Sequence, residues 1–239
     1  PLLKHLHILE RRGIKCYIQY SLNDYEKEGL EKNVPPLSQR IDTFKHLVDV
    51  LGQGHVIWRF DPLVLTDNID IDLLLTKAEN IGDQLLGYTD KLVFSFADIL
   101  SYRRVQNNLQ KAHINYVDWQ EPQMRKFAQE LSILNNKWKY DLATCGEKID
   151  ITEFGIKKNH CIDDELIIKL AYDDKVLMDF LQVKQFPIAQ ADLFGNVEAL
   201  PSDAIVLPNG MYAIHGDNKD SGQRFFCGCI RSKDIGEYN

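Results

Sequence analysis

Hydrophobic and polar positions in the first 150 residues follow two alternating periods. Leucines recur at helical spacing in 2–12, and Gly13 follows as a stop signal. β-forming residues then fill 15–22, which predicts a strand that ends at Asn23 and Asp24. The helix-then-strand pattern returns three times. Helices are expected at 35–52, 69–87 and 121–137, and strands at 55–62, 91–98 and 139–147.

Local signals mark several ends of these elements. Ser38 lies where the N-cap of the helix 35–52 is expected, and Gly52 is placed to end that helix. Pro62 ends the second strand, and Pro122 suits the first turn of the helix 121–137. The segment 99–120 is expected to be a long connection.

Strands separated by helices must be parallel, because each helix carries the chain back over the sheet. The fold class is therefore α/β, and a full or partial (β/α) TIM-like barrel with parallel strands is the favoured architecture. An open doubly wound sheet is the alternative, but no Gly-x-Gly-x-x-Gly motif follows a strand. The chain starts with a helix, so the first strand of the barrel is expected to be missing.

The pattern changes after residue 150. A helix is expected from Cys161 to Asp174, and proline and glycine then interrupt short apolar runs in 181–218. Residues 203–217 predict a hairpin with Pro-Asn-Gly as its turn. We therefore expect a barrel-like domain at 1–180. An irregular, hairpin-containing appendage at 181–239 is expected to pack on the barrel mouth.

Composition narrows the classes of partner. The chain carries a net charge of −7 with 44% hydrophobic residues, as in ordinary soluble domains with a full core. No apolar run approaches the ~20 residues of a membrane span, and no signal peptide is visible. A cytoplasmic protein without a membrane partner is expected. Nucleic acid is disfavoured, because the arginine doublets Arg11-Arg12 and Arg103-Arg104 make no broad basic face.

Polar residues stand at the ends of all four predicted strands, where a (β/α) barrel has its active site. They are Asn23, Asp24, Arg59, Asp61, Ser95, Asp98, Thr144, Cys145 and Glu147. Arg59 and Asp61 fit a functional pair and a structural ion pair equally well, because an unpaired charge inside an apolar strand is costly. For Asn23 and Asp24 a structural role is favoured.

Five cysteines in a chain of this length indicate reduced thiols or metal ligands. Cys16 lies within a strand and is expected to pack in the core. Cys145 ends a strand, and Cys161 is expected to begin a helix, where a thiolate is favoured. Cys227 and Cys229 point to one side of an extended segment. Four of them suit zinc or an iron–sulfur cluster. Buried free thiols, a Cys227–Cys229 redox pair and a partial metal site completed beyond the chain are alternatives.

Five stretches carry a resemblance to a known family. They are VIWRFDPLVLTDNID, FSFADILSYRRV, DLATCGE, GIKKNHCID and KDSGQRFFCGCIRSKDIGEYN. With them the chain resembles, along its whole length, the bacterial family catalogued as domain of unknown function 1848. The R-F-D-P element is also similar to one in relatives of spore photoproduct lyase.

The resemblance implies chemistry that lies outside this chain. Members of the family continue into a Cys-x₃-Cys-x₂-Cys segment, the spacing with which radical S-adenosylmethionine enzymes bind a [4Fe–4S] cluster. They also begin with a further strand and a Ser-Arg-Arg motif. S-adenosylmethionine and this cluster are therefore implied for a full-length form only, and the chain is expected to be cut at both ends.

Two sets of residues match positions of the family motifs. The cysteines are Cys145, Cys161, Cys227 and Cys229, which the resemblance assigns to a metal or auxiliary cluster site. The expected substrate-binding residues are Arg59, Asp61, Ser95, Asp98, Lys219, Asp220, Gln223 and Arg224. Cys16 matches no motif position, in agreement with its expected place in the core.

Three functions remain open. The leading one is a radical S-adenosylmethionine-like enzyme of unknown substrate, with an electron donor as a partner. The second is a zinc-stapled binding or structural protein without catalysis, which would lose stability on chelation. The third is a metal-free barrel hydrolase or lyase that uses Asp61, Asp98 or Glu147 as acid and base.

Overall fold

The computed structural model describes residues 3–188 and 199–215, and these residues form two compact units. The first unit comprises the described residues up to Asn159, and the second begins at His160. The sequence predicts a domain boundary at residue 180. In the structure the two helices between residues 160 and 180 belong to the second unit instead.

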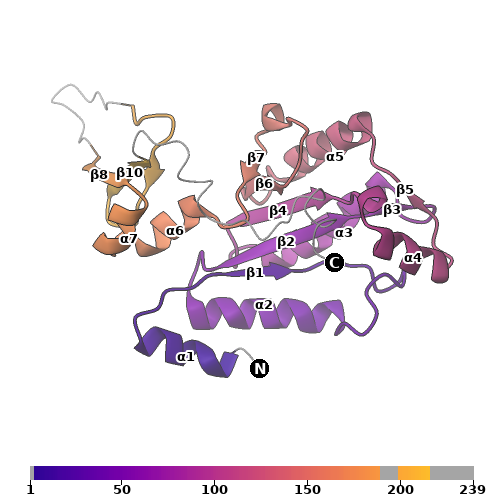
Figure 1. The fold of residues 1–239 in the computed structure, drawn as a ribbon, viewed down its shortest axis with the longest axis horizontal. Coiled ribbons are helices and arrows are strands. Elements are labelled where there is room, and N and C mark those ends of the chain that lie inside the picture. Colours follow the sequence, from indigo (N-terminus) through magenta and orange to yellow (C-terminus); the bar gives the residue numbers. More distant parts are fainter. Residues whose placement is uncertain (1–2, 189–198, 216–239) are drawn as a thin grey trace. The chain divides into compact units, whose positions relative to one another are not determined.

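A five-stranded parallel sheet is the framework of the first unit, with the order β1-β2-β4-β6-β7 (Figure 1). The strands are β1 (Ile18–Ser21), β2 (Val56–Leu63), β4 (Lys91–Phe96), β6 (Asp141–Cys145) and β7 (Lys157–Asn159). The predicted α/β class with parallel strands is therefore confirmed. Within the described residues the sheet is open at β1 and β7, so a closed TIM barrel is not formed there.

Helices of the first unit cover one face of this sheet. They are α1 (Leu3–Arg11), α2 (Leu37–Leu51), α3 (Ile71–Leu85) and α5 (Glu121–Leu134), whereas α4 (Arg103–Lys111) contributes no residue to their common core. α3 contacts both α2 and α5, and Phe44, Ile81 and Phe127 of these three helices share one core with the strand residues Trp58 and Phe94. The strands lie side by side in the order in which they occur in the chain. Right-handed connections between strands in this order all pass over the same face, so the helices lie on one side of the sheet.

Side chains of β2 alternate between the two faces of the sheet. Trp58 and Phe60 belong to the helix-covered core, whereas Ile57 and Arg59 are not part of it. This period of two follows from the pleat of a strand. Polar strand residues therefore collect on the face that the helices leave uncovered.

Capping explains where two helices begin. Asp70 caps α3 through its carboxylate, which accepts a hydrogen bond from the Leu73 N–H at 2.8 Å. The prediction that Ser38 caps α2 is wrong, since Ser38 lies inside that helix and Pro36 is its N-cap. The Glu26 carboxylate accepts the Leu37 N–H, so a distant loop supplies the cap that sequence reasoning sought locally.

Three helix and strand ends follow the sequence signals closely. Gly52 ends α2 with a φ of 95°, as predicted, because glycine adopts positive φ without strain. Pro122 lies in the first turn of α5. β2 runs one residue past Pro62 before it ends.

The segment 99–120 contains structure that sequence reasoning missed. It forms the short 3-10 helix η1 (Ile99–Ser101), α4 and β5 (Tyr116–Val117). β5 pairs antiparallel with β3 (Leu65–Thr66). The missed β7 follows a second 3-10 helix, η2 (Thr152–Phe154).

The second unit is a small α+β structure. Its elements are α6 (Asp164–Ala171), α7 (Lys175–Phe180), β8 (Val183–Pro187), β9 (Ile205–Val206) and β10 (Met211–His215). The strands form an antiparallel sheet in the order β8-β10-β9, and β9 and β10 make the predicted hairpin around Pro-Asn-Gly. Ile168, Met178 and Ala213 are buried in its own core.

No helix in residues 3–188 or 199–215 has the length and apolar character that crossing a membrane requires.

Candidate functional site

The carboxyl-terminal ends of β1, β2, β4 and β6 meet at one edge of the sheet, because all four strands are parallel. Asn23, Asp61, Ser95 and Glu147 lie at or just beyond these ends. This edge is where the α/β architecture collects loops from several strands, so ligand-binding groups are expected there. We call it the sheet edge below.

Local backbone geometry brings Arg59 and Asp61 to the same side of β2. They are two residues apart, so the pleat directs both side chains the same way. The pairing register between β2 and β4 shifts between Phe60 and Leu63, and the Asp61–Pro62 peptide bond is cis. A register shift between paired strands changes the direction of the side chains that follow it.

Asp61 is the centre of the polar contacts at the sheet edge. Its Oδ2 accepts hydrogen bonds from Arg59 Nε at 3.0 Å and from Arg59 Nη2, and its Oδ1 accepts one from Ser95 Oγ. The side chains of Arg59 and Asp61 are 15% and 20% exposed. β2 and β4 therefore present one connected group of side chains.

Asn23 fixes the backbone of Asp61 with two hydrogen bonds. The Asp61 N–H donates to Asn23 Oδ1 at 2.9 Å, and Asn23 Nδ2 donates to the Asp61 carbonyl at 3.1 Å. Tyr25 acts on the next residues, since its hydroxyl donates to the Pro62 carbonyl at 3.0 Å and accepts from the Val64 N–H. The loop after β1 thus holds the end of β2 in place.

Arg59 uses all three of its guanidinium nitrogens within the protein. Nε and Nη2 bind Asp61, and Nη1 donates to Gln19 Oε1 on β1. Burial acts to lower the Arg59 pKa, but the Asp61 carboxylate and the Cys145 side chain outweigh it and raise that pKa above its usual value. Arg59 is therefore charged at all working pH values, and its main contact is Asp61.

Glu147 brings a second carboxyl group to the sheet edge. Its Oε1 accepts the backbone N–H of Phe96 at 2.8 Å. Burial raises the Glu147 pKa to about 7, with smaller contributions from the charges of Asp61 and Asp98, although the Phe96 hydrogen bond opposes the shift. This carboxyl group is placed to hold or release a proton near neutral pH.

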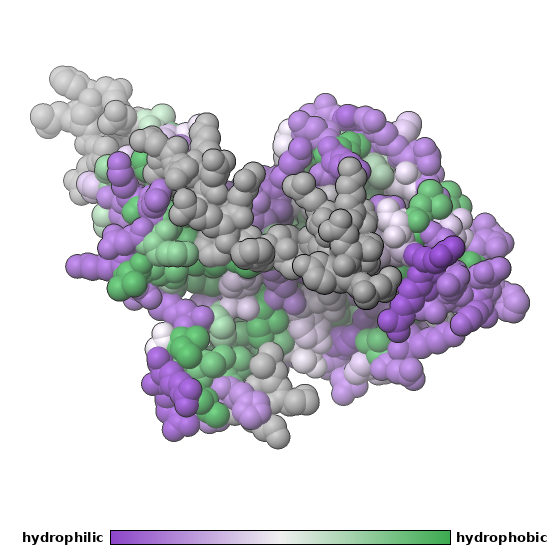
Figure 2. All heavy atoms as spheres, in the orientation of Figure 1, coloured by the Kyte–Doolittle hydropathy of each residue, from purple (hydrophilic) through white to green (hydrophobic). Residues whose placement is uncertain are grey.

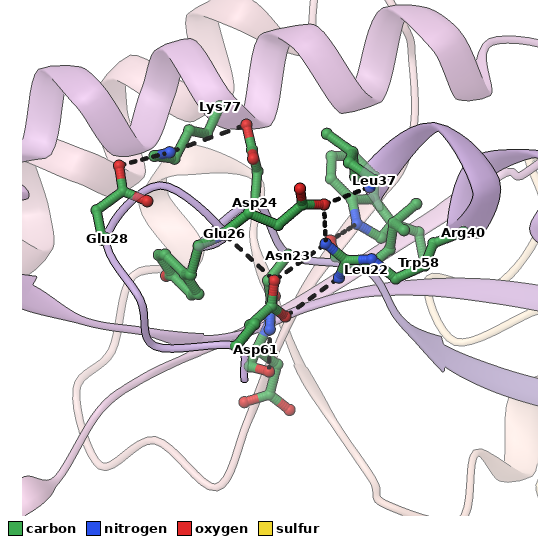
Figure 3. Close-up of polar contacts among 12 residues, drawn as sticks. Leu22, Asn23, Asp24, Glu26, Glu28, Leu37, Arg40, Trp58, Asp61 and Lys77 are labelled. Atoms are coloured by element: carbon green, nitrogen blue, oxygen red, sulfur yellow. Dashed lines mark hydrogen bonds and ion pairs between the residues drawn. The ribbon is translucent and has the colours of Figure 1, made fainter. Parts of the chain in front are cut away.

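Charged residues of the loop after β1 are attached to two buried cations. Figure 3 shows Arg40 of α2 beside Glu26, and Lys77 of α3 between Asp24 and Glu28. Lys77 Nζ lies 3.0 Å from Glu28 and 3.8 Å from Asp24. The structural reading of Asp24 is supported by this ion pair, and the loop is anchored on the helix layer.

The predicted site residues of β2 and β4 come together only in part. Arg59, Asp61 and Ser95 form direct contacts, as described above. Asp98 instead precedes η1, and its Oδ2 accepts a hydrogen bond from Ser101 Oγ at 2.6 Å. The remaining predicted residues lie outside the described part of the chain, namely Lys219, Asp220, Gln223 and Arg224.

The sequence did not predict that Gln19 binds Arg59. It also gave no indication that Asn23 holds the backbone of Asp61. Gln19 lies on β1, two residues before Ser21, which is in register with Arg59 of the neighbouring strand. The sequence signal was a polar residue inside an apolar strand, two positions before Ser21, so that both side chains lie on the same face of the sheet. Asn23 carried no such signal, because a polar residue directly after a strand is common in any loop.

The cysteines have different surroundings. Cys16 packs against the core of the first unit, as predicted. Cys145 ends β6, is buried and interacts with Arg59 at the sheet edge. The prediction that Cys161 begins a helix is wrong, because α6 starts at Asp164 and Asp163 is its N-cap. The argument that a helix N-terminus acts on this thiol therefore does not apply.

The four-cysteine site stays a prediction. Cys227 and Cys229 lie outside the described residues. Among residues 3–188 and 199–215, no group of three or more His, Cys, Asp and Glu side chains is arranged to hold a metal ion.

The fold and this site define an α/β protein with polar residues gathered at the carboxyl edge of a parallel sheet. Comparison with family models identifies the family. Residues 1–239 match the model described as domain of unknown function (DUF1848), and the chain belongs to this family. No curated protein and no solved structure matches the chain.

Proposed function

We propose that the chain belongs to a radical S-adenosylmethionine-like enzyme of the (β/α) type, whose substrate binds at the sheet edge. The observation that carries a substrate site is the convergence of Arg59, Asp61 and Ser95 from adjacent parallel strands, with Glu147 at the same edge. The radical chemistry rests on the resemblance of the motifs. An open sheet whose strands follow the chain order is compatible with a partial barrel.

Asp61 is the proposed substrate-binding group, with Ser95 beside it. A carboxylate and a hydroxyl recognise an amine or a hydroxyl group on a substrate. Arg59 acts as a positioning residue in this proposal, since its nitrogens already hold Asp61 and Gln19. Asp98, Lys219, Asp220, Gln223 and Arg224 are proposed to complete the substrate site.

We further propose that Cys145, Cys161, Cys227 and Cys229 bind zinc or an auxiliary iron–sulfur cluster. Thiolates are suitable ligands for both. The position of Cys145 agrees with such a role, since it ends β6 at the sheet edge and its side chain contacts Arg59. An iron–sulfur cluster there supplies single electrons, whereas zinc acts as a staple between segments of the chain.

A form of the protein that includes the Cys-x₃-Cys-x₂-Cys segment implied by the family resemblance, reconstituted anaerobically with iron and sulfide, tests the proposed chemistry. We expect stoichiometric iron, the broad visible absorbance of a cluster, and an EPR signal after reduction. A Cys145→Ser variant should lose the metal of the auxiliary site and keep that of the family triad. Colourless protein without iron would overturn the proposal, and stoichiometric zinc in its place would favour the stapled binding protein.

Substrate binding is tested separately by a thermal-shift screen of amines, polyols and carboxylates. A ligand of the site should raise the melting temperature of the wild type and have no effect on Asp61→Asn. Equal shifts in both proteins would place the ligand elsewhere. This outcome is independent of iron content, so the two parts of the proposal fail separately.

The second candidate is a metal-free hydrolase or lyase, and the placement of two carboxyl groups favours it. Asp61 is held by cationic and hydroxyl donors, whereas Glu147 has a backbone donor and a buried position. Burial raises the Glu147 pKa to about 7, which suits a general acid or base at neutral pH. Turnover of a substrate by iron-free protein, abolished in Glu147→Gln, would establish this function instead.

A further inference from the structure

The segment that follows β4 has a composition unlike the rest of the chain. Residues 99–117 contain Arg103, Arg104 and Lys111 but no aspartate or glutamate, in a protein whose net charge is −7. The segment begins directly after Asp98 and is joined to it by the Ser101 hydrogen bond. A locally basic surface therefore lies next to the sheet edge.

The three cations of α4 form no ion pair with another residue in the described part of the chain. Arg103, Arg104 and Lys111 are all exposed. By contrast, Arg40, Arg59, Lys77, Arg125 and Lys137 all pair with carboxylates. Arg103 and Lys111 are eight residues apart and Arg104 and Lys111 seven, so the three cations share one side of the helix.

Apolar side chains lie beside these cations. Leu100 is 64% exposed, and Tyr102 and Val105 are each 41% exposed. Leu109 is the buried contact of α4 with the rest of the unit. Figure 2 shows apolar atoms next to strongly hydrophilic ones at the end of the first unit where Figure 1 places α4.

The surface is also held in a fixed shape. Gln106 Nε2 donates to the Ile99 carbonyl at 3.0 Å and to the Leu100 carbonyl at 2.8 Å, which ties η1 to α4. An ordered surface loses little conformational entropy on binding. We call Leu100, Tyr102, Arg103, Arg104 and Val105, with Lys111, the α4 surface.

We propose that the α4 surface binds a protein partner through a patch that combines acidic and apolar side chains. Exposed arginines and an exposed lysine need negative charge opposite them, and the exposed leucine, tyrosine and valine need apolar contact. Tyrosine and arginine are the residues that concentrate binding energy in protein interfaces. Nucleic acid is the weaker match, because the exposed leucine and valine gain nothing from phosphates. This inference does not depend on the proposed radical chemistry.

Fluorescence anisotropy with the complete chain tests the proposal. The probe is a labelled 15-residue synthetic peptide of Glu, Asp, Leu and Phe, and the comparison probes are a 20-nucleotide single-stranded DNA and anionic phospholipid vesicles. We expect the peptide to bind at 50 mM NaCl, with an affinity that falls as salt rises. Binding of DNA or vesicles without binding of the peptide would overturn the proposal.

Two variants and a matched control locate the binding. Arg103→Gln with Arg104→Gln should weaken peptide binding by about fivefold at low salt, since exposed ion pairs contribute modestly. Leu100→Ser with Val105→Ser should weaken it at high salt as well. Arg11→Gln with Arg12→Gln removes the other exposed arginine doublet, and we expect no change. An equal loss in that control, or unchanged binding in both α4 variants, would contradict the assignment.

Discussion

Asp61 receives contacts from a neighbour on its own strand and from two segments that are distant in the sequence. Arg59 and Ser95 bind its carboxylate, and Asn23 binds its backbone. An aspartate held in this way keeps one rotamer, which is what a substrate-binding carboxylate requires. The same contacts make Asp61 important for stability, because Arg59 is mostly buried and depends on it for its counter-charge.

Replacement of Asp61 by Asn should therefore lower the free energy of unfolding. The amide has the same shape but leaves the Arg59 cation without a counter-charge, and we expect a loss of about 2–3 kcal/mol. Urea denaturation followed by circular dichroism measures it. Asp72→Asn is the control, because Asp72 is 78% exposed in its pair with Lys126 and should cost less than about 1 kcal/mol. Equal losses in the two variants would contradict this account of Asp61.

Glu147 should make stability depend on pH. Its pKa is about 7 in the folded chain against a usual value of 4.5, so the folded chain binds this proton more tightly than the unfolded chain does. The contribution is complete below pH 4.5 and is lost as pH rises to about 7. Glu147→Gln keeps an oxygen for the Phe96 N–H and cannot ionise. Its stability relative to the wild type should rise between pH 4.5 and 7 and then stay constant.

Urea denaturation at four pH values between 4.5 and 8 measures this difference. The control is Glu153→Gln, because the Glu153 side chain is exposed and pairs with Arg125. A Glu147→Gln variant whose relative stability does not change with pH would show that Glu147 has an ordinary pKa.

At the scale of elements, the sequence predicted what periodicity and caps encode. Four helices and the four strands that follow them, from α1 to β6, follow from apolar spacing, and Gly52 ends α2 as expected. α4 was missed because only Leu109 of its nine residues is buried, which gives no apolar stripe. β7 was missed because a polar Lys-Lys-Asn edge strand depends on pairing with β6 rather than on its own residues.

The candidate site was predictable to a similar extent. Strand ends pointed to Arg59, Asp61 and Ser95, because each follows or interrupts an apolar run. The contacts among them depend on the register of two strands and on the bulge near Pro62, which no local pattern encodes. The anchoring of the β1 loop by Arg40 and Lys77 is likewise a tertiary effect.

Close packing between α3 and Trp138 gives a prediction for this element. A Cβ atom at Gly82 would lie 2.4 Å from the Trp138 ring, which is too close for any side chain. We expect Gly82→Ala to lower the free energy of unfolding by about 1–3 kcal/mol through overpacking, although alanine is the better helix former. Thermal and urea unfolding measure it, and adding Trp138→Phe should restore part of the loss. A more stable Gly82→Ala variant would mean that α3 and Trp138 are further apart.

Lys77 gives a second prediction, for the loop after β1. Its side chain is 5% exposed and pairs with Glu28, which is 13% exposed. Lys77→Met leaves that carboxylate without a counter-charge, and we expect a loss of about 2–4 kcal/mol together with faster amide hydrogen exchange in residues 23–36. Lys137→Met removes an exposed pair with Asp83 and should change neither by a comparable amount. Unchanged exchange in the loop would contradict its anchoring by Lys77.

At the scale of the whole molecule, charge is distributed unevenly. The net charge is −7, and the carboxyl groups of Asp61 and Glu147 lie at the sheet edge. In the segment 99–117, by contrast, all charged residues are basic. A substrate site and a partner site with opposite charge can therefore lie next to each other on the first unit. Long-range steering of an acidic partner would then act on the α4 surface rather than on the sheet edge.

The measurement that tests the central claim most directly is the formation of 5′-deoxyadenosine from S-adenosylmethionine under reducing conditions. The protein used is the anaerobically reconstituted form that includes the Cys-x₃-Cys-x₂-Cys segment implied by the family resemblance. A radical S-adenosylmethionine-like enzyme should form 5′-deoxyadenosine in an amount that depends on iron and on the reductant. Asp61→Asn should retain the iron but lose the stimulation that a bound substrate gives. No 5′-deoxyadenosine from protein that carries its full complement of iron would contradict the proposed function.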